Sequence, residues 1–181
     1  FDARLANAPV SLMTYLAKTL WPYDLAVFYP FSDQLLFWQV AGSTMLIAVI
    51  SLAVIIAAKR MPYLLVGWLW YVITILPVLD IFRSSFRAMS DNYTYLPAVG
   101  IYMMAAWGIP VLFQEKQIRS TILWPAGIAV TVMLSALAWQ QCGYWQNSFK
   151  LFNHALHVTK DNYLAYNQRG NVYSKSQQYP P

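Results

Sequence analysis

Charged residues are scarce in this sequence. Asp, Glu, Lys and Arg make up 10% of its 181 residues, whereas 59% are hydrophobic and 17% are aromatic. A soluble domain carries about 25% charged residues, with which it covers its apolar interior. A soluble fold of this length cannot hide so much apolar surface. We therefore expect most of the chain to lie in lipid, with Trp and Tyr side chains at the membrane–water interfaces.

Cysteine is almost absent as well. Cys142 stands alone, which excludes an internal disulfide and a zinc site built from cysteines. His154 and His157 lie three residues apart on an expected helix, but no further ligands accompany them. We therefore expect solvated histidines and no metal site. No P-loop, glycine-rich nucleotide fingerprint or Ser-His-Asp arrangement is found, and no cofactor is evident.

The positive charge, +5 in total, is not gathered into a basic stripe. Basic residues stand singly or in pairs at the ends of apolar runs, as the signals that set membrane topology do. This distribution argues against nucleic acid as a partner and favours the lipid bilayer.

Four apolar stretches predict membrane-spanning helices within a membrane region 35–139. The first has no charged residue, and about 20 apolar residues suffice to cross a bilayer. A short basic turn separates it from the second stretch, which predicts a tight antiparallel hairpin. Pro77 should kink the second helix. The four stretches are 35–58, 63–82, 95–113 and 121–139.

The two ends of the chain differ from this region. Residues 1–34 form an expected interfacial or loop segment with helix-breaking prolines. Within it, 8–20 either lies at the interface as an amphipathic helix or ends a further spanning helix. From residue 140 onward polar residues increase, and 140–181 predicts a water-soluble helical part. Because the sequence starts with Phe1, we expect it to be an excerpt of a longer protein.

The soluble part carries a periodic pattern of small and aromatic residues. A tetratricopeptide repeat has 34 residues and two helices that interlock through such residues at fixed positions. With Tyr163 as the first position, five residues fit one register, whereas Arg169 and Lys160 depart from it. We therefore expect 140–181 to begin a repeat domain. The residues expected to pack in it are Phe152, Ala155, Tyr166, Gly170 and Tyr173.

Four segments also match motifs of a known family. They are Lys18-Thr19-Leu20-Trp21-Pro22, Pro62-Tyr63-Leu64-Leu65-Val66-Gly67-Trp68-Leu69-Trp70-Tyr71, Asp91-Asn92-Tyr93-Thr94-Tyr95-Leu96-Pro97 and Leu151-Phe152-Asn153-His154-Ala155-Leu156. The chain thereby resembles the transmembrane and tetratricopeptide repeat proteins, most nearly the bacterial members. The resemblance implies a glycosyltransferase of the C type, O-mannosylating in eukaryotic members, that takes a sugar from a lipid-phosphate carrier. The family's catalytic acidic residue would lie upstream, outside these residues.

Alternation of the spans places the N-terminal segment, the loop 83–94 and the soluble part on one side of the membrane. Basic residues are too evenly distributed to decide which side this is. The resemblance implies the extracytoplasmic side: the periplasm for a bacterial cytoplasmic membrane, or the lumen for an endoplasmic reticulum membrane.

The loop that follows the second span is the candidate binding site. Asp80, Arg83 and Arg87 share one face if the helix continues, and arginine suits phosphate oxygens. We expect Arg83 or Arg87 to bind the lipid phosphate of the donor, in a pocket shaped by Asp91, Tyr93 and Tyr95. Alternatively, both arginines contact lipid headgroups. Asn92 begins an N-glycosylation pattern, but it lies too close to a span for use to be expected.

The sequence thus predicts an all-α protein: polytopic membrane helices followed by the start of a tetratricopeptide (αα) repeat. The expected function is to glycosylate protein from a lipid-linked sugar, with the acceptor protein or peptide bound by the repeats. The alternative is a non-enzymatic membrane-anchored scaffold whose repeats recruit partner proteins.

Overall fold

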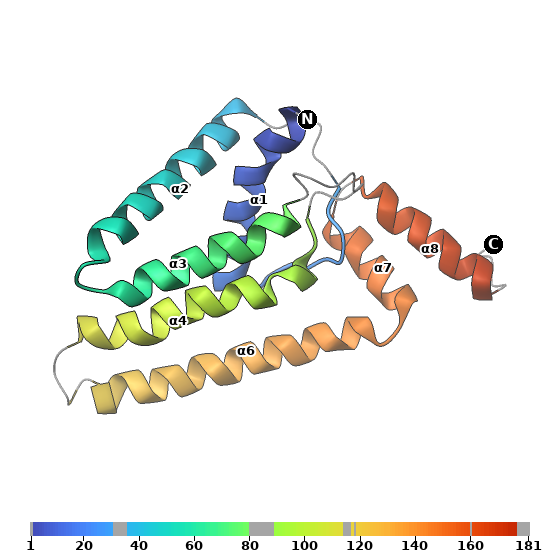
Figure 1. The fold of residues 1–181 in the computed structure, drawn as a ribbon. Coiled ribbons are helices and arrows are strands. Elements are labelled where there is room, and N and C mark those ends of the chain that lie inside the picture. Colours follow the sequence, from blue (N-terminus) through green and yellow to red (C-terminus); the bar gives the residue numbers. More distant parts are fainter. Residues whose placement is uncertain are drawn as a thin grey trace.

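The fold is all-α, as the sequence predicts (Figure 1). The computed structural model describes residues 2–30, 36–79, 89–113, 117, 119–159 and 161–176. Among these residues, β-type pairing is limited to one bridge between Tyr29 and Met89. The helices are α1 (Asp2–Leu20), α2 (Phe37–Ala57), α3 (Pro62–Ile75), α4 (Tyr95–Leu112), α6 (Trp124–Trp145), α7 (Ser148–Val158) and α8 (Tyr163–Ser176). Short turns of other helical types are η1 (Leu76–Val78), η2 (Asp91–Tyr93) and η3 (Arg119–Leu123).

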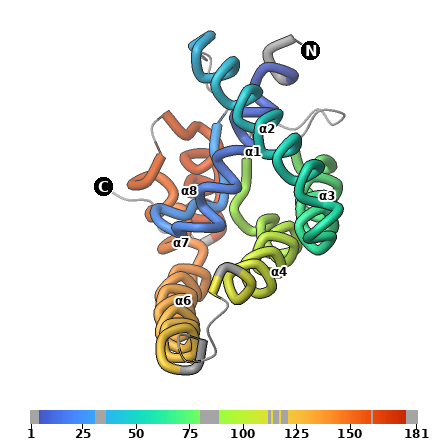
Figure 2. Tube along the Cα trace, turned by 90° about the vertical axis from the view of Figure 1, so that its left-hand side faces the viewer, coloured from blue at the N-terminus to red at the C-terminus, as the bar shows by residue number. Residues whose placement is uncertain are grey.

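Helices α1 to α4 form the main bundle, in which α3 and α4 lie side by side and α1 crosses them (Figures 1 and 2). Two aromatic side chains of α3 carry a polar atom into this bundle and form hydrogen bonds there. The Tyr71 hydroxyl donates to the carbonyl oxygen of Leu12 at 2.7 Å. The Trp68 indole donates to Ser51 at 3.0 Å. These bonds tie α1 to α3 and α3 to α2.

Helices α2 and α6 are long, apolar and exposed. A run of 25 residues, Thr121–Trp145, covers the end of η3 and all of α6, and α2 has 21 residues. Only 6% of the apolar window of α2 and 0% of that of α6 is buried, whereas a core helix of a soluble protein would be mostly buried. A helix of 21 residues is about 31 Å long, which matches the hydrocarbon core of a bilayer. The chain is a membrane protein.

The other two expected spans coincide with apolar helices. These are Pro62–Val78 and Tyr95–Val111, shorter than α2 and α6. That all four stretches cross the bilayer stays a prediction. Pro77 lies in η1, where the α-helix of α3 gives way to a tighter turn, as expected of a proline. The predicted continuation to residue 82 lies outside the described residues.

Helix α1 begins earlier than the amphipathic stretch 8–20 and packs into the bundle. Leu12, Tyr15 and Thr19, which lie on one face of this helix, are buried. Leu20 is 64% exposed. The hydroxyl of Tyr102 on α4 also donates to the carbonyl oxygen of Thr19. This face of α1 thus contacts other parts of the chain, and whether 8–20 lies at the interface or ends a further span stays open.

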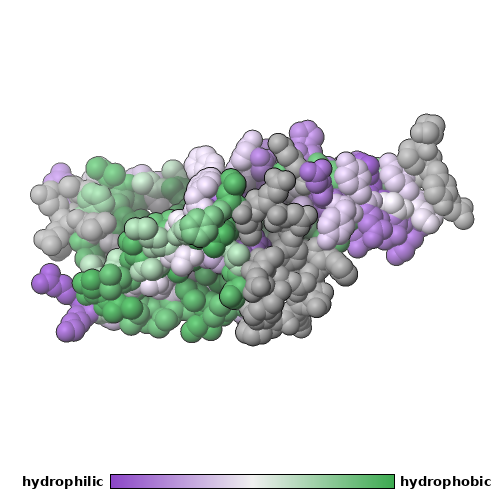
Figure 3. Space-filling view, turned by 90° about the horizontal axis from the view of Figure 1, so that it is seen from above, coloured by the Kyte–Doolittle hydropathy of each residue, from purple (hydrophilic) through white to green (hydrophobic). Residues whose placement is uncertain are grey.

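The polar end of the molecule is the α7–α8 hairpin. Hydrophobic residues gather over the membrane bundle, and hydrophilic residues gather at the opposite end (Figure 3). The expected boundary at residue 140 falls inside α6, which continues to Trp145. The break comes at Asn147, whose side chain accepts a hydrogen bond from Phe149 N at 2.8 Å and so caps α7.

Candidate functional site

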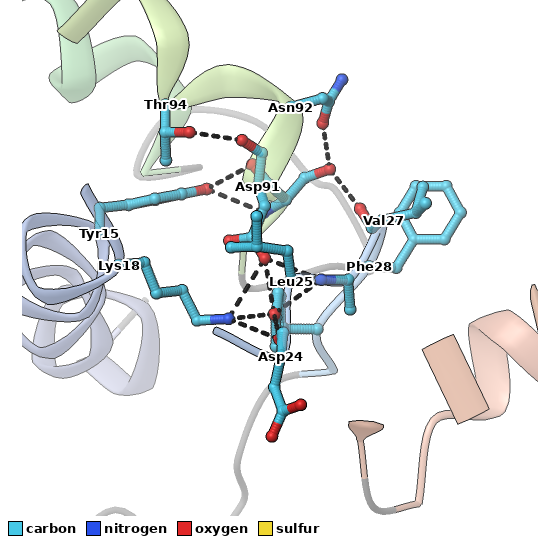
Figure 4. A network of polar contacts seen from close by, with 12 residues as sticks. Tyr15, Lys18, Asp24, Leu25, Val27, Phe28, Asp91, Asn92 and Thr94 are labelled. Carbon is cyan, nitrogen blue, oxygen red and sulfur yellow. Dashed lines mark hydrogen bonds and ion pairs between the residues drawn. The ribbon is translucent and has the colours of Figure 1, made fainter. Parts of the chain in front are cut away.

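A cluster of polar groups lies where the end of α1, the loop 21–30 and η2 meet (Figure 4). Lys18 donates to Asp91 Oδ2 at 3.2 Å, to the carbonyl oxygen of Asp24 at 2.9 Å, and to the hydroxyl of Tyr29. Three acceptors match the three protons of an ammonium group. The side chains of Lys18 and Asp91 are only 16% and 8% exposed. We call Lys18, Asp24, Ala26, Tyr29 and Asp91 the Lys18–Asp91 network.

The conformation of Asp24 helps to build this network. Its φ is 49°, a left-handed conformation that aspartate tolerates better than most residues. Its carbonyl oxygen accepts a hydrogen bond from Lys18 and lies 2.8 Å from the Tyr29 hydroxyl oxygen. Its carboxylate points away from the network in Figure 4. Asp24 therefore contributes its backbone to the network and leaves its charge at the surface.

Asp91 receives most of the hydrogen bonds of the network on one oxygen. Besides Lys18, the Tyr29 hydroxyl donates to Oδ2 at 2.6 Å and the Ala26 N–H donates to it at 2.8 Å. The other oxygen, Oδ1, is buried and has no hydrogen-bond partner among the described residues. The three donors to Oδ2 therefore hold the carboxylate in place.

Tyr29 remains a hydrogen-bond donor because of its surroundings. Burial raises the pKa of its hydroxyl well above the ordinary value, and the negative charge of Asp91 raises it further. Desolvation and a nearby like charge both disfavour a phenolate. The phenol therefore stays protonated at neutral pH and acts as a donor to Asp91, not as a base.

A second set of bonds fastens the start of the η2 segment. The Tyr15 hydroxyl accepts from Ser90 N at 2.8 Å and donates to Ser90 O at 3.1 Å. The Ser90 hydroxyl also donates to the carbonyl oxygen of Val27 and contacts Asn92. Ser90 is 2% exposed. Residues 89–94 are thereby fixed to α1 and to the loop 21–30 at once.

The structure describes three of the five predicted donor-binding residues, Asp91, Tyr93 and Tyr95. Asp91 lies at the centre of the network, where its partners belong to the chain itself. Tyr93 and Tyr95 are 36% and 76% exposed beside it. Arg83 and Arg87, like Asp80, lie outside the described residues. Their role in donor binding stays a prediction.

The predicted repeat-packing residues differ in burial and in the contacts they make. Ala155 is completely buried, and Tyr173 packs edge-on against Phe149 with ring centroids 4.3 Å apart. Phe152 stacks on Phe28 of the loop 21–30. Tyr166 is 56% exposed. At Gly170 an added β-carbon would meet nothing within 4 Å, so this contact surface does not require a small residue there.

The expectation that both histidines are solvated is wrong for His154. Its Nε2 lies 3.2 Å from the carbonyl oxygen of Leu25. Its ring stacks on Tyr144, with centroids 3.9 Å apart. His157 is exposed. Within the part of the chain that the structure describes, no three His, Cys, Asp or Glu residues come together as a metal site requires.

Lys18 and Tyr29 are site residues that the sequence reasoning did not select. Lys18 is the one charged residue in the apolar stretch 8–20, and a charge in such a stretch is a candidate site by default. That signal would have identified Lys18. Nothing local would have identified Tyr29, because its role depends on Asp91, 62 residues away.

The chemistry available to the network follows from these bonds. The Lys18 ammonium has no proton left for a ligand, and the Asp91 carboxylate is shielded and held by donors. Such groups hold a loop in position and do not transfer protons to a substrate. The exposed rings and hydroxyls of Tyr93 and Tyr95 lie on the surface of the loop that the network fixes.

Comparison with known proteins gives one distant similarity. No protein-family model matches the chain, and no solved structure matches it. The chain is 25% identical over 122 residues to the protein O-mannosyl-transferase Tmtc3 of Drosophila melanogaster. The match covers 65% of this chain and 12% of the Drosophila protein.

Proposed function

We propose that this chain is the C-terminal membrane region, with the start of a repeat domain, of a glycosyltransferase. The enzyme would move a sugar from a lipid-phosphate carrier to a protein on the extracytoplasmic face of a membrane. The similarity to a protein O-mannosyl-transferase over 122 residues is the observation that carries this proposal. The two long, exposed, apolar helices agree with a substrate that arrives from lipid.

The position of the loop before α4 supports a role beside the donor. Its described part, 89–94, is fixed by Lys18 and Tyr15 at the end of the bundle that also carries the α7–α8 hairpin. We assign the lipid phosphate to Arg83 and Arg87, because a guanidinium binds phosphate oxygens in a planar fork. Tyr93 and Tyr95 would border the sugar, and Asp91 would hold the loop in place.

In the proposed reaction, this region binds the donor phosphate and the rest of the protein supplies the base. The hydroxyl oxygen of an acceptor serine or threonine would bond to the anomeric carbon, and the bond from that carbon to the lipid phosphate would break. The leaving phosphate needs positive charge, which the two arginines would supply. The base that takes the hydroxyl proton would come from residues upstream of this chain.

Location follows from the same proposal. The end of the molecule that carries the Lys18–Asp91 network and the hairpin would face the periplasm in a bacterium, or the lumen of the endoplasmic reticulum in a eukaryote. Lys59 and Arg60, at the turn between α2 and α3, would face the cytoplasm, as positive residues tend to.

The test is sugar transfer by the full-length protein in membranes, with a polyprenyl-phosphate-linked mannose as donor. Arg83→Gln and Arg87→Gln should weaken donor binding and slow transfer about tenfold or more each, since a charge-assisted hydrogen bond contributes roughly 1.5–3 kcal/mol. Arg60→Gln, at the opposite end of the bundle, is the matched control and should transfer at the normal rate. Unchanged donor affinity in both loop variants would refute their assignment.

The second candidate function is a non-enzymatic scaffold. It is favoured by the network itself, in which the charges of Lys18 and Asp91 serve each other and other groups of the same chain. A scaffold would capture partner proteins through its repeats and transfer no sugar. Partner capture by full-length protein that shows no transfer with any polyprenyl-phosphate sugar would decide for this alternative.

A further inference from the structure

Residues 24–29 lie between the membrane bundle and the α7–α8 hairpin and bond to both. On the bundle side, the Ala26 N–H donates to Asp91 Oδ2 at 2.8 Å, and Asp91 N donates back to the Ala26 carbonyl oxygen at 3.3 Å. Tyr29 N donates to the carbonyl oxygen of Met89 at 3.0 Å. We call residues 24–29 the strap.

Two carbonyl oxygens of the strap, those of Leu25 and Phe28, are bound by the C-terminal part of the chain. Asn162 Nδ2 donates to the Phe28 carbonyl oxygen at 2.8 Å. His154 Nε2 lies 3.2 Å from the Leu25 carbonyl oxygen. The Phe28 ring stacks on Phe152 at a centroid distance of 6.5 Å and an angle of 15°. The two polar contacts join residues 129 and 134 positions apart in the sequence.

Three alanines close the contact between the strap and the hairpin. Ala26 is 3% exposed, and Ala155 of α7 and Ala165 of α8 are completely buried in one cluster with it. Small side chains allow the strap backbone to approach both helices closely. Within the described residues, neither α7 nor α8 packs extensively against α1 to α4. Apart from the covalent path through α6, the strap is therefore the main link between the hairpin and the bundle.

We propose that the strap sets the orientation of the repeat domain relative to the membrane helices, and that Asn162 is its principal fastening. Asn162 is 0% exposed, and its side chain has two separate roles. Its Oδ1 accepts from Ala165 N at 3.0 Å and so caps α8. Its Nδ2 donates to the strap and to the hydroxyl of Thr159. A buried amide whose oxygen and nitrogen are both hydrogen-bonded holds the groups around it in one geometry.

One substitution separates the two roles of Asn162, which are to cap α8 and to bind the strap. Asn162→Asp keeps an oxygen that caps α8, since aspartate is as good an N-cap as asparagine. It removes the donor and places a carboxylate oxygen against the Phe28 carbonyl oxygen. The matched control is Asn153→Asp on α7. Asn153 Oδ1 accepts from Arg169 within the hairpin at 3.0 Å, and an aspartate preserves that bond.

The experiment measures the position of the hairpin directly. Spin labels are placed at Leu69→Cys on α3 and Lys175→Cys on α8, in full-length protein with Cys142→Ser, and distance distributions are recorded in lipid nanodiscs. Asn162→Asp should raise the population at non-native distances about tenfold, because a lost buried hydrogen bond of roughly 1.4 kcal/mol changes a population by that factor. Asn153→Asp should give the wild-type distribution.

Two outcomes would overturn the proposal. One is an unchanged distribution in both Asn162→Asp and Phe28→Ala, the second variant, which removes the stacking on Phe152 and leaves α8 intact. The other is an equal change in Asn153→Asp, which would show general loosening of the hairpin. Far-ultraviolet circular dichroism of each variant establishes that its helices are formed.

The consequence for catalysis rests on the proposed glycosyltransferase function. If the repeats present the acceptor, Asn162 is a positioning residue. Asn162→Asp should then raise the KM for a folded acceptor protein and leave kcat for a short peptide unchanged. An equal loss of kcat on both acceptors contradicts positioning. Absence of transfer by the wild-type protein refutes the proposed function, whereas the distance measurement still decides on the strap.

Discussion

Gly67 and Gly100 lie against each other where α3 and α4 meet. A β-carbon added to Gly67 would come 2.6 Å from the carbonyl oxygen of Gly100, and one added to Gly100 would come 2.3 Å from that of Gly67. Both distances are far below van der Waals contact, and the atoms met belong to the backbone. The two helices approach this closely because neither has a side chain at the contact, as is common between membrane helices.

This contact predicts a strong effect of a single methyl group. Gly67→Ala or Gly100→Ala should force α3 and α4 apart and lower the free energy of unfolding by about 1–3 kcal/mol, the usual cost of overpacking. Thermal unfolding in a mild detergent measures the change. Gly42→Ala and Gly127→Ala are the controls, since an added β-carbon at either meets nothing within 4 Å. Equal melting temperatures of all four variants would contradict the close approach.

The ion pair between Lys18 and Asp91 predicts non-additive substitutions. Lys18→Met leaves the shielded carboxylate without its counter-charge, and breaking a buried pair in this way costs about 3–5 kcal/mol. Lys18→Met combined with Asp91→Asn removes both charges and should cost less than the sum of the two single variants. Chemical unfolding of the three variants in detergent measures the coupling. Lys150→Met, at an exposed lysine of α7, should change little, and strict additivity would show that the pair contributes nothing.

Tyr29 predicts a loss of stability in alkali. Its folded-state pKa lies above the ordinary value of 10.0, so above that pH the unfolded chain releases a proton that the folded protein keeps. The unfolded state then binds fewer protons, and the stability that is present below pH 10 is lost as the pH rises. Tyr29→Phe should flatten this loss between about pH 9 and 11. Tyr166→Phe, at an exposed ring, should leave the pH profile as it is, and identical profiles for both variants would contradict the burial of Tyr29.

The arrangement of α2, α3, α4 and α6 predicts opposite exposure of two lysines. Lys59 lies at the turn after α2, and Lys175 lies near the end of α8. In sealed vesicles of protein with Cys142→Ser, an impermeant maleimide should label Lys59→Cys or Lys175→Cys, but not both. After the vesicles are opened with detergent, both positions should react. Labelling of both in intact vesicles would place the turn and the hairpin on the same side.

The sequence predicts some elements closely because a physical limit fixes them. Helix α2 was expected over 35–58 and is found at Phe37–Ala57, since an uncharged run of this length has one stable state in lipid. The end of α6 was placed too early. Polarity rises from Gln140, but α6 continues to Trp145, and Asn147 then caps the start of α7. A capping argument at Asn147-Ser148 would have given the start of α7.

The candidate site was predicted less well, for a different reason. Asp91 was selected for its place in the loop after the second span, yet its observed partners are Lys18, Tyr29 and Ala26, 62 to 73 residues away. Pairing over such separations is decided by tertiary packing and leaves no local pattern in a single sequence. The alignment of α1 with loop 89–94 was not predictable from residue spacing, whereas the common side of the N-terminal, loop and C-terminal parts was. Contacts of Tyr15 with Ser90 and of Asn162 with Phe28 place these three parts next to one another, and their side of the membrane stays a prediction.

The geometry around the Lys18 ammonium also restricts how this protein can vary through evolution. Three oxygens surround a single nitrogen, and a planar guanidinium cannot place its donors at one point. Arginine is therefore not an acceptable replacement at position 18, although it keeps the charge. Because Tyr29 and Asp91 serve the same nitrogen, the three positions should change together or not at all among descendants. Their joint presence would mark relatives that overall sequence identity is too low to reveal.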